Sequence, residues 1–375
     1  MTNLIYADNA ATTKLDIDAF EAMRPYLLDL YANASQPYSF SRHAKKALKQ
    51  SRDTIATCIN ASPEEIYFTS GGTESDNWAI KGIMLYYNNQ YSLITSQIEH
   101  HAILHSATTI ESMGYPVSYL PVDSTGIILP ETLQSYITEQ TKLVSVMLSN
   151  NEVGTIEPIK ELAAIAHKNE ALFHTDAVQA VGHLKIDVKA LDVDMLSASA
   201  HKFNGPKGIG FLYIKKGTQI NPFNDGGAQE YGKRAGTENV AAIVGMATAL
   251  KKNCADISVN SAYLYKLEQF LIDKLKSANI DFLRNGAANH VPGNMSLSFK
   301  NSSGEMLLHR LDLKGICVST GSACDSNNMQ VSHVLEAMKI PREYAEGTIR
   351  ISLSKDNTLD DVESIVAALI SILKP

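Results

Sequence analysis

The chain has 375 residues, of which 45% are hydrophobic and 19% are charged, and its formal net charge is −7. This length can bury a large core, and one large domain with a smaller second one is the natural division. The negative charge gives no electrostatic surface for nucleic acid or an acidic membrane, and no apolar run reaches the length of a membrane span. The first residues lack the basic and apolar regions of a signal peptide, so we expect a cytoplasmic protein.

Strand-like and helix-like segments alternate through the first two-thirds of the chain. Short apolar runs precede helical patterns at 74–87, 101–113 and 159–167. Such alternation is typical of βαβ units, and it predicts an α/β fold with a mostly parallel, seven-stranded sheet that carries helices on both faces. The predicted strands are 65–69, 92–95, 117–120, 143–148, 172–175, 193–196 and 210–214.

The pattern changes near residue 237. A long helical stretch at about 239–278 leads into a region with fewer strands, and a last helix at 360–373 follows Thr358, a suitable N-cap. We therefore predict that 255–375 form most of a second, α+β domain. Its predicted strands are 295–299, 315–319 and 348–353.

The first motif with chemical content is the loop from Ser70 to Thr73, which follows a strand and opens a helix. Its glycines allow backbone N–H groups and the helix dipole to meet an anion such as phosphate. No Gly-Lys-Ser/Thr follows, so this is not a Walker loop. Taken alone, the loop fits a helix cap equally well.

Lys202 stands between an apolar, strand-like run and a Gly/Pro loop, where a lysine can be held in a pocket. A desolvated lysine loses part of its proton affinity and becomes an amine nucleophile that can form an imine with an aldehyde. Upstream, another strand ends in Asp176, which alone would be a common helix N-cap. A lysine amine together with an acid for a ring nitrogen is what pyridoxal 5'-phosphate (PLP) requires.

The four cysteines are too few for a disulfide framework, and none forms the C-x-x-C pair that would indicate structural zinc. We predict no metal site. Cys58 and Cys254 lie in helix-like patterns, and Cys317 lies in a strand-like one. Cys324 differs, because glycine, serine, aspartate and asparagine surround it. Such a loop leaves a thiol exposed and available to react.

Arg350 lies within a strand-like run, where an arginine needs a partner. It could clamp the carboxylate of an amino acid with two hydrogen bonds, or it could form a structural ion pair. Position alone favours the ion pair.

Six motifs in this order resemble one known family nearly end to end. They are YADNAATT (6–13), FTSGGTESDN (68–77), NNEVG (150–154), the lysine segment (197–210), RAGTEN (234–239) and GSAC (321–324). The chain resembles the cysteine desulfurases of the IscS/NifS type, in the class V aminotransferase family of fold type I PLP enzymes. The resemblance implies a PLP-dependent transferase-like fold. It also implies a large PLP-binding domain at 16–254 and a small domain made of 1–15 and 255–375, which carries a reactive cysteine loop at about 319–332.

The resemblance assigns roles to individual residues. Lys202 would bind PLP, Asp176 would sit against the ring nitrogen, and His100 would stack on the ring as a candidate acid or base. Arg350, assisted by Asn33, would bind the substrate carboxylate. Asn151 and Gln179 would bind the ring hydroxyl, and the phosphate cup would comprise Gly72, Thr73, Ser199, His201 and, from the second subunit of a homodimer, Thr237.

The implied reaction removes sulfur from L-cysteine. Lys202 takes the α-proton, Cys324 attacks the substrate sulfur as a thiolate, and L-alanine leaves. Cys324 then carries a persulfide for a sulfur acceptor, such as an iron–sulfur cluster scaffold or a thiolation enzyme. The sequence does not identify the acceptor.

The chain departs from the family at several positions. Ala228 and Tyr231 replace a glycine and an arginine, and Ala34 follows Asn33 where the family has proline. Asp325 places a negative charge beside Cys324, which should raise the pKa of that thiol. These changes bear on substrate preference, turnover and partner choice rather than on the cofactor site.

Two other interpretations stay open. One is a selenocysteine lyase or another aminotransferase-like PLP enzyme, although a transaminase has no need of a loop thiol. The other is a weakly active scaffold that mainly binds a sulfur-transfer partner.

Overall fold

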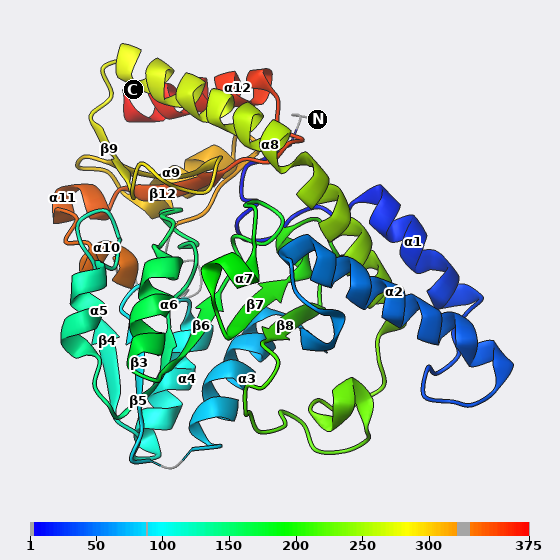
Figure 1. Ribbon diagram of the computed structural model, residues 1–375. Helices are drawn as coiled ribbons and strands as arrows, with labels where there is room; N and C mark the ends of the chain where they lie inside the picture. Colours follow the sequence, from blue (N-terminus) through cyan, green and yellow to red (C-terminus); the bar gives the residue numbers. More distant parts are fainter. Residues whose placement is uncertain (1–3, 88, 321–330, 375) are drawn as a thin grey trace.

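A seven-stranded sheet forms the centre of the larger part of the molecule in the computed structural model, which describes residues 4–87, 89–320 and 331–374 (Figure 1). The strand order is β2-β8-β7-β6-β5-β3-β4, and only β8 runs antiparallel to its neighbours. The predicted mostly parallel sheet of seven strands is confirmed. The strands are β2 (Ile66–Thr69), β3 (Ser92–Ser96), β4 (Val117–Leu120), β5 (Thr141–Ser145), β6 (Leu172–Asp176), β7 (Met195–Ser199) and β8 (Gly210–Ile214).

Helices cover both faces of this sheet, because its strands are apolar on both sides. In β8, Phe211 and Tyr213 pack into one core cluster while Leu212 packs into another, as the two-residue repeat of a strand requires. The Leu212 face is covered by α3 (Gly72–Met84) and α4 (His101–Ser112). The opposite face is covered by α1 (Ile17–Leu28), α2 (Arg42–Ile59), α5 (Pro130–Tyr136), α6 (Ile159–Lys168), α7 (Val188–Leu191) and the first half of α8 (Val240–Ser277).

A second, separate core surrounds a three-stranded antiparallel sheet of order β12-β10-β9. Beside it, β1 and β11 form a short parallel pair. The predicted strands at 295–299, 315–319 and 348–353 correspond to β10, β11 and β12, whereas β9 was not predicted. The elements are β1 (Ile5–Tyr6), β9 (Phe282–Asn285), β10 (Asn294–Phe299), β11 (Ile316–Cys317), β12 (Thr348–Ser352), α9 (Gly304–Asp312), α10 (His333–Ala337), α11 (Arg342–Ala345) and α12 (Leu359–Leu373).

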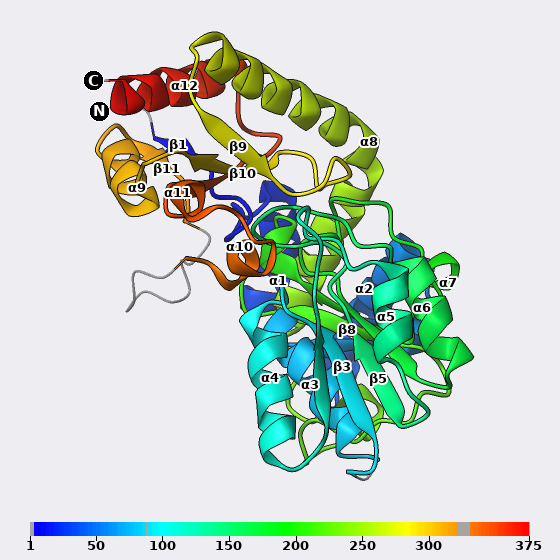
Figure 2. The ribbon, with the colours of Figure 1, turned by 90° about the vertical axis from the view of Figure 1, so that its left-hand side faces the viewer.

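The long helix α8 runs from one core to the other (Figures 1 and 2). Its 38 residues give a length of roughly 57 Å at 1.5 Å per residue. Residues 242–250 pack in the core of the large sheet, and residues 264–275 pack against the small one. The predicted domain bounds, 16–254 against 1–15 with 255–375, stay a prediction. The predicted boundary at 254–255 falls within α8, between the residues that pack in the large core and those that pack in the small one.

The carboxyl ends of the strands meet along one edge of the large sheet. Thr69 of β2 pairs with Gly210, which also pairs with Ser199 of β7, so the ends of β2 and β7 lie on either side of β8. The ends of β3, β5 and β6 follow along the same edge. Ligands of open α/β sheets bind at this edge, and the predicted cofactor residues other than Thr237 follow these strand ends.

Candidate functional site

A cavity of about 430 Å³ opens at this edge. Nine residues predicted from the sequence to hold the cofactor line it: Gly72, Thr73, His100, Asn151, Asp176, Gln179, Ser199, His201 and Lys202. They come from the ends of five different strands, so only the folded sheet brings them together. Residues that the sequence analysis did not single out also line the cavity, among them Thr12, Asp76, Met147, Val178 and Lys207.

The phosphate cup is built from two glycines at the start of α3. Gly71 has φ +151° and lacks a side chain to cap the helix, so the first N–H groups of the 13-residue helix are left for a ligand. A Cβ on Gly72 would come within 2.6 Å of Val178 Cγ2, and one on Gly71 within 3.5 Å of Ser199 Oγ. At Gly72 the backbone therefore approaches the opposite wall at a distance that only glycine allows, and at Gly71 the positive φ favours glycine.

Asp176 ends β6 at the base of the cavity, where its Oδ1 accepts a hydrogen bond of 2.8 Å from Val178 N. Burial raises the pKa of Asp176 to about 6, although this hydrogen bond and Lys202 oppose the shift. A cationic ring nitrogen would favour its ionised form. The buried acid, the glycine cup and the lysine together fit PLP.

A second acid, Asp76, lies beside Asp176 and was not found from the sequence. It is fully buried, and its Oδ1 has no hydrogen-bond partner among the described residues. Burial, followed by the charge of Asp176, raises the pKa of Asp76 well above its usual range. Its neighbour His174 is hydrogen-bonded to Ser145 and Ser197, each at 2.9 Å, and burial lowers the pKa of His174 to about 3. The base of the cavity therefore carries little charge beyond that of Asp176.

Lys202 lies in a short 3-10 turn (Ala200–Lys202) after β7. Its Nζ donates hydrogen bonds to the carbonyl oxygens of Ala10 and Ala11, at 2.6 and 2.8 Å. The N-terminal segment therefore orients the amine.

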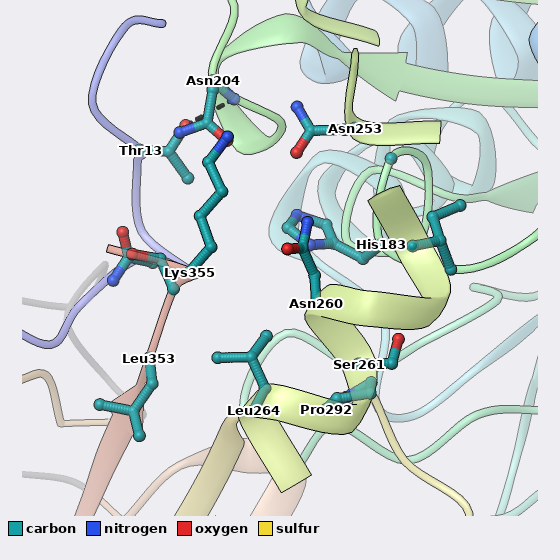
Figure 3. A pocket seen from close by; sticks show the side chains of 14 residues that line it. Thr13, His183, Asn204, Asn253, Asn260, Ser261, Leu264, Pro292, Leu353 and Lys355 are labelled. Carbon is teal, nitrogen blue, oxygen red and sulfur yellow. Dashed lines mark hydrogen bonds between the residues drawn. The ribbon is translucent and has the colours of Figure 1, made fainter. Parts of the chain in front are cut away.

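Side chains from three other parts of the fold hold the backbone of this turn. Thr13 Oγ1 donates to the carbonyl of His201 at 2.9 Å, and Asn253 Nδ2 donates to that of Phe203 at 2.8 Å. His183 Nε2 is hydrogen-bonded to the carbonyl of Lys202, also at 2.8 Å. Thr13, His183 and Asn253 border a small cavity behind the turn (Figure 3).

His100 caps the N-terminus of α4, since its Nδ1 accepts a hydrogen bond of 3.1 Å from Ala102 N. Burial, then Lys202, lowers the pKa of His100 to about 4. The ring is therefore neutral near pH 7 and carries its proton on Nε2. Nearby, the ring centroid of His101 lies 5.1 Å from that of His105 and 5.1 Å from that of His333. Even so, within the described ranges no three His, Cys, Asp or Glu residues are arranged to hold a metal ion.

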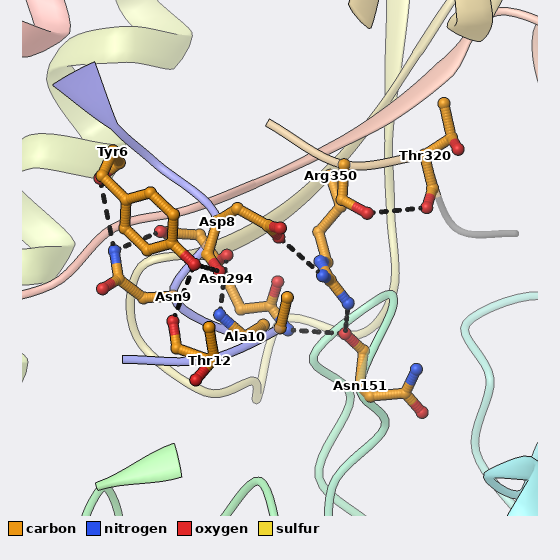
Figure 4. Close-up of polar contacts among 12 residues, drawn as sticks. Tyr6, Asp8, Asn9, Ala10, Thr12, Asn151, Asn294, Thr320 and Arg350 are labelled. Carbon is orange, nitrogen blue, oxygen red and sulfur yellow. Dashed lines mark hydrogen bonds and ion pairs between the residues drawn. The ribbon is translucent and has the colours of Figure 1, made fainter. Parts of the chain in front are cut away.

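Arg350 lies on β12 and is 6% exposed (Figure 4). It forms an ion pair of 2.8 Å with Asp8 through NH2, and its NH1 donates to the carbonyl of Asn151 at 2.9 Å. Asn151 lines the cavity, so Arg350 borders the cofactor site without lining it. The ion pair expected from position alone is present, and the guanidinium also contacts Asn151 of the cavity lining.

Two predicted residues lie apart from this cavity within the described chain. Asn33 Oδ1 accepts a hydrogen bond of 2.8 Å from Ser35 N. Thr237 is exposed, as a residue that completes a second subunit's site would be.

Cys324 lies outside the described residues, as does Asp325. The residues that flank this part of the chain are anchored beside the cavity. On one side, Ser319 N donates to the carbonyl of Arg350 at 3.1 Å. On the other side, Ser332 Oγ donates to Glu152 Oε2 at 2.5 Å, and His333 Nε2 is 3.1 Å from the carbonyl of Glu99.

The two departures before RAGTEN are accommodated locally. Ala228 has φ −81°, which any residue adopts, so its methyl group imposes no backbone strain. Tyr231 is 62% exposed, and its ring centroid lies 5.4 Å from the guanidinium carbon of Arg52. Arg52 in turn binds Glu230 with two hydrogen bonds of 2.9 and 2.7 Å. Neither change reaches the described cavity lining.

Comparisons with known proteins point to one family. The family model of aminotransferase class-V matches residues 5–365. The chain is 45% identical to a cysteine desulfurase IscS of Methanosarcina thermophila, over 99% of this chain and 92% of that protein. A solved NifS-like protein superposes with a TM-score of 0.93 at 37% identity, covering 99% of both chains. The structure of SspA in complex with cysteine gives a TM-score of 0.84 at 34% identity, covering 94% of this chain and all of that one.

Within the described part of the chain, no helix has the length and apolar character to cross a bilayer.

Proposed function

Because the chain belongs to the aminotransferase class-V family, we propose that the cavity at the strand ends removes sulfur from L-cysteine. The protein is a PLP-dependent cysteine desulfurase. The observation that carries the assignment of residues is a single cavity lined by a lysine amine, a buried aspartate and a glycine cup. The roles of the individual residues below are part of the proposal.

We propose that the cofactor is held at three points. The helix start at Gly72 and Thr73, with Ser199 and His201, holds the phosphate, and Asp176 faces the ring nitrogen. When bound, PLP draws electrons away from the substrate α-carbon and so makes its proton removable. Asn151 and Gln179 line the wall between, where they can bind the ring hydroxyl.

Lys202 and His100 handle protons in this proposal. The Lys202 amine takes the proton from the α-carbon of L-cysteine. Support comes from its place in the cavity lining, where its Nζ donates hydrogen bonds to the carbonyl oxygens of Ala10 and Ala11. His100 is neutral, with its Nδ1 fixed by the helix cap, so its Nε2–H is available to donate.

Cys324 receives the sulfur. Its thiolate attacks the substrate sulfur, the C–S bond breaks, and its electron pair stays with the carbon fragment, which takes up a proton and leaves as L-alanine. Support comes from the described residues on either side of this segment: Ser319 N donates to the carbonyl of Arg350, and Ser332 Oγ donates to Glu152, the neighbour of Asn151 in the cavity wall. The persulfide then passes to an acceptor, such as an iron–sulfur scaffold or a thiolation enzyme.

We also propose a cytoplasmic homodimer in which Thr237 completes the phosphate cup of the other subunit. Support comes from α1, on which Ile17, Phe20, Leu27 and Leu28 are exposed. Large apolar side chains gathered on one helix are typical of a surface that another chain covers.

The test is alanine release from L-cysteine by the purified PLP-loaded protein, with a thiol reductant present. Cys324→Ala should keep the PLP absorbance but release no alanine, and Cys317→Ala, the matched control, should behave as wild type. In a parallel reaction without the reductant, which would remove the outer sulfur of a persulfide, mass spectrometry should find one added sulfur on Cys324 after a single turnover. Alanine release at the wild-type rate by Cys324→Ala would refute the persulfide role and favour an aminotransferase-like reaction. A PLP-loaded protein that releases no alanine would favour the scaffold interpretation.

A further inference from the structure

The ion pair between Arg350 and Asp8 joins two parts of the molecule that are 342 residues apart in the sequence (Figure 4). Arg350 is 6% exposed, and the side chain of Asp8 is 19% exposed. Water screens a pair this buried only weakly, so the charge of Asp8 is strongly felt by the guanidinium.

Two of the three nitrogens of the Arg350 guanidinium have hydrogen-bond partners among the described residues. Its NH2 group binds Asp8 at 2.8 Å, and its NH1 group binds the carbonyl of Asn151 at 2.9 Å. Its Nε–H is buried and has no hydrogen-bond partner among the described residues. An unmet buried donor costs free energy, and a carboxylate at the cavity border would satisfy it.

The segment that carries Asp8 also carries the carbonyl groups that hold the Lys202 amine. Ala10 N donates to Ser352 Oγ at 2.9 Å, and the Ala10 carbonyl accepts from Lys202 Nζ at 2.6 Å. Asn9 Nδ2 adds a hydrogen bond of 2.9 Å to the Ser352 carbonyl. The backbone at Asp8 is therefore held against Ser352 of β12, on the strand that carries Arg350.

A resident carboxylate changes how strongly Arg350 attracts another one. Substrate L-cysteine and product L-alanine carry the same carboxylate, so a bare buried guanidinium would bind both tightly. Interactions that are equal for substrate and product do not speed the chemical step, and they delay release. A guanidinium already partly neutralised attracts both ligands less.

We propose that Asp8 is a positioning residue for Arg350, which aims the guanidinium at the cavity and limits its affinity for the carboxylates of substrate and product. This inference rests on the proposed role of Arg350. Asp8 does not line the described cavity, so it acts through the arginine.

The test uses the PLP-loaded protein and measures the dissociation constant of L-alanine by calorimetry, beside kcat and KM for L-cysteine. Asp8→Asn keeps an oxygen that accepts from Arg350 but removes the charge, so L-alanine should bind about tenfold more tightly and KM should fall. Asp8→Ser, a second neutral variant, should shift the alanine affinity in the same direction. A merely structural role would lower the melting temperature without strengthening alanine binding.

Arg350→Gln separates the two proposals. It should weaken alanine binding at least tenfold, and adding Asp8→Asn to it should have no further effect. If Arg350→Gln leaves alanine binding unchanged, the carboxylate role of Arg350 is wrong. If Arg350→Gln weakens binding but both Asp8 variants leave alanine affinity unchanged or weaker, the inference about Asp8 alone is overturned.

Discussion

Gly72→Ala tests whether the glycine cup is built for the cofactor phosphate. The new Cβ would lie 2.6 Å from Val178 Cγ2, well inside the 3.4–4 Å of ordinary contact. Val178 cannot rotate away easily, because β-branched side chains are stiff at χ1. It must therefore move with its backbone, whose N–H holds the Asp176 carboxylate at 2.8 Å.

The magnitude follows from the size of the clash. Inserting a methyl group into a filled space costs about 1–3 kcal/mol. Because the strain falls on the phosphate cup and on Asp176 together, we expect PLP affinity to fall by roughly 5- to 150-fold. The assay is titration of the apoprotein with PLP, followed by absorbance.

Val178→Ala supplies the decisive control. It removes the clashing methyl group, so Gly72→Ala/Val178→Ala should regain most of the PLP affinity that Gly72→Ala loses. Gly208→Ala is the matched variant at the cavity rim, where φ is +77° but nothing lies within 4 Å of the added Cβ. Adding Val178→Ala to Gly208→Ala should therefore bring no gain in PLP affinity. If the double variant binds PLP as weakly as Gly72→Ala, the steric argument is wrong.

Three further predictions concern single residues away from the cup. Burial raises the pKa of Glu157 from 4.5 to about 8. Between these pH values the folded state holds a proton that the unfolded state has lost. The free energy of unfolding therefore falls as the pH rises, by up to about 1.4 kcal/mol per pH unit. Glu157→Gln should flatten this loss in urea titrations of the apoprotein at pH 5 to 8, and an unchanged slope would contradict it. Arg52→Met leaves Glu230 buried without its cation and should destabilise the protein by about 3–5 kcal/mol, whereas Arg52→Met/Glu230→Gln should lose clearly less. His100→Asn keeps an N-cap acceptor for α4, so the melting temperature should hold while alanine release falls by about a hundredfold, and a wild-type rate would exclude a role in proton transfer.

Local pattern was enough to predict most of the large sheet. All seven strands were predicted within a few residues, because a strand buried on both faces is a short apolar run with few competing interpretations. The capped last helix was also predicted, and Thr358 forms the N-cap with Asp361. The helix-like pattern at Cys58 corresponds to α2, whereas β9 was not predicted, because it is a half-buried run of four residues with no period to detect.

The residues of the site also fall into those that the sequence predicted and those that it did not. Motifs that follow strand ends could be assigned from the sequence, because parallel strands deliver their carboxyl ends to one edge whatever the rest of the chain does. Lys202, Asp176 and the glycine cup belong to this class. Their order along the chain and the resemblance they carry were sufficient to predict the cofactor and the reaction.

Only the tertiary structure decided which groups surround those residues. The sequence does not distinguish Asp76 from other aspartates on helices. Only the packing of α3 against the sheet brings it close to Asp176. The carbonyl groups that hold Lys202, and the carboxylate that holds Arg350, come from residues 8–11, about 190 and 340 positions away. Contacts between such distant residues leave no periodicity in the sequence. They depend on how the two separate cores pack against each other, which no local preference of the chain determines.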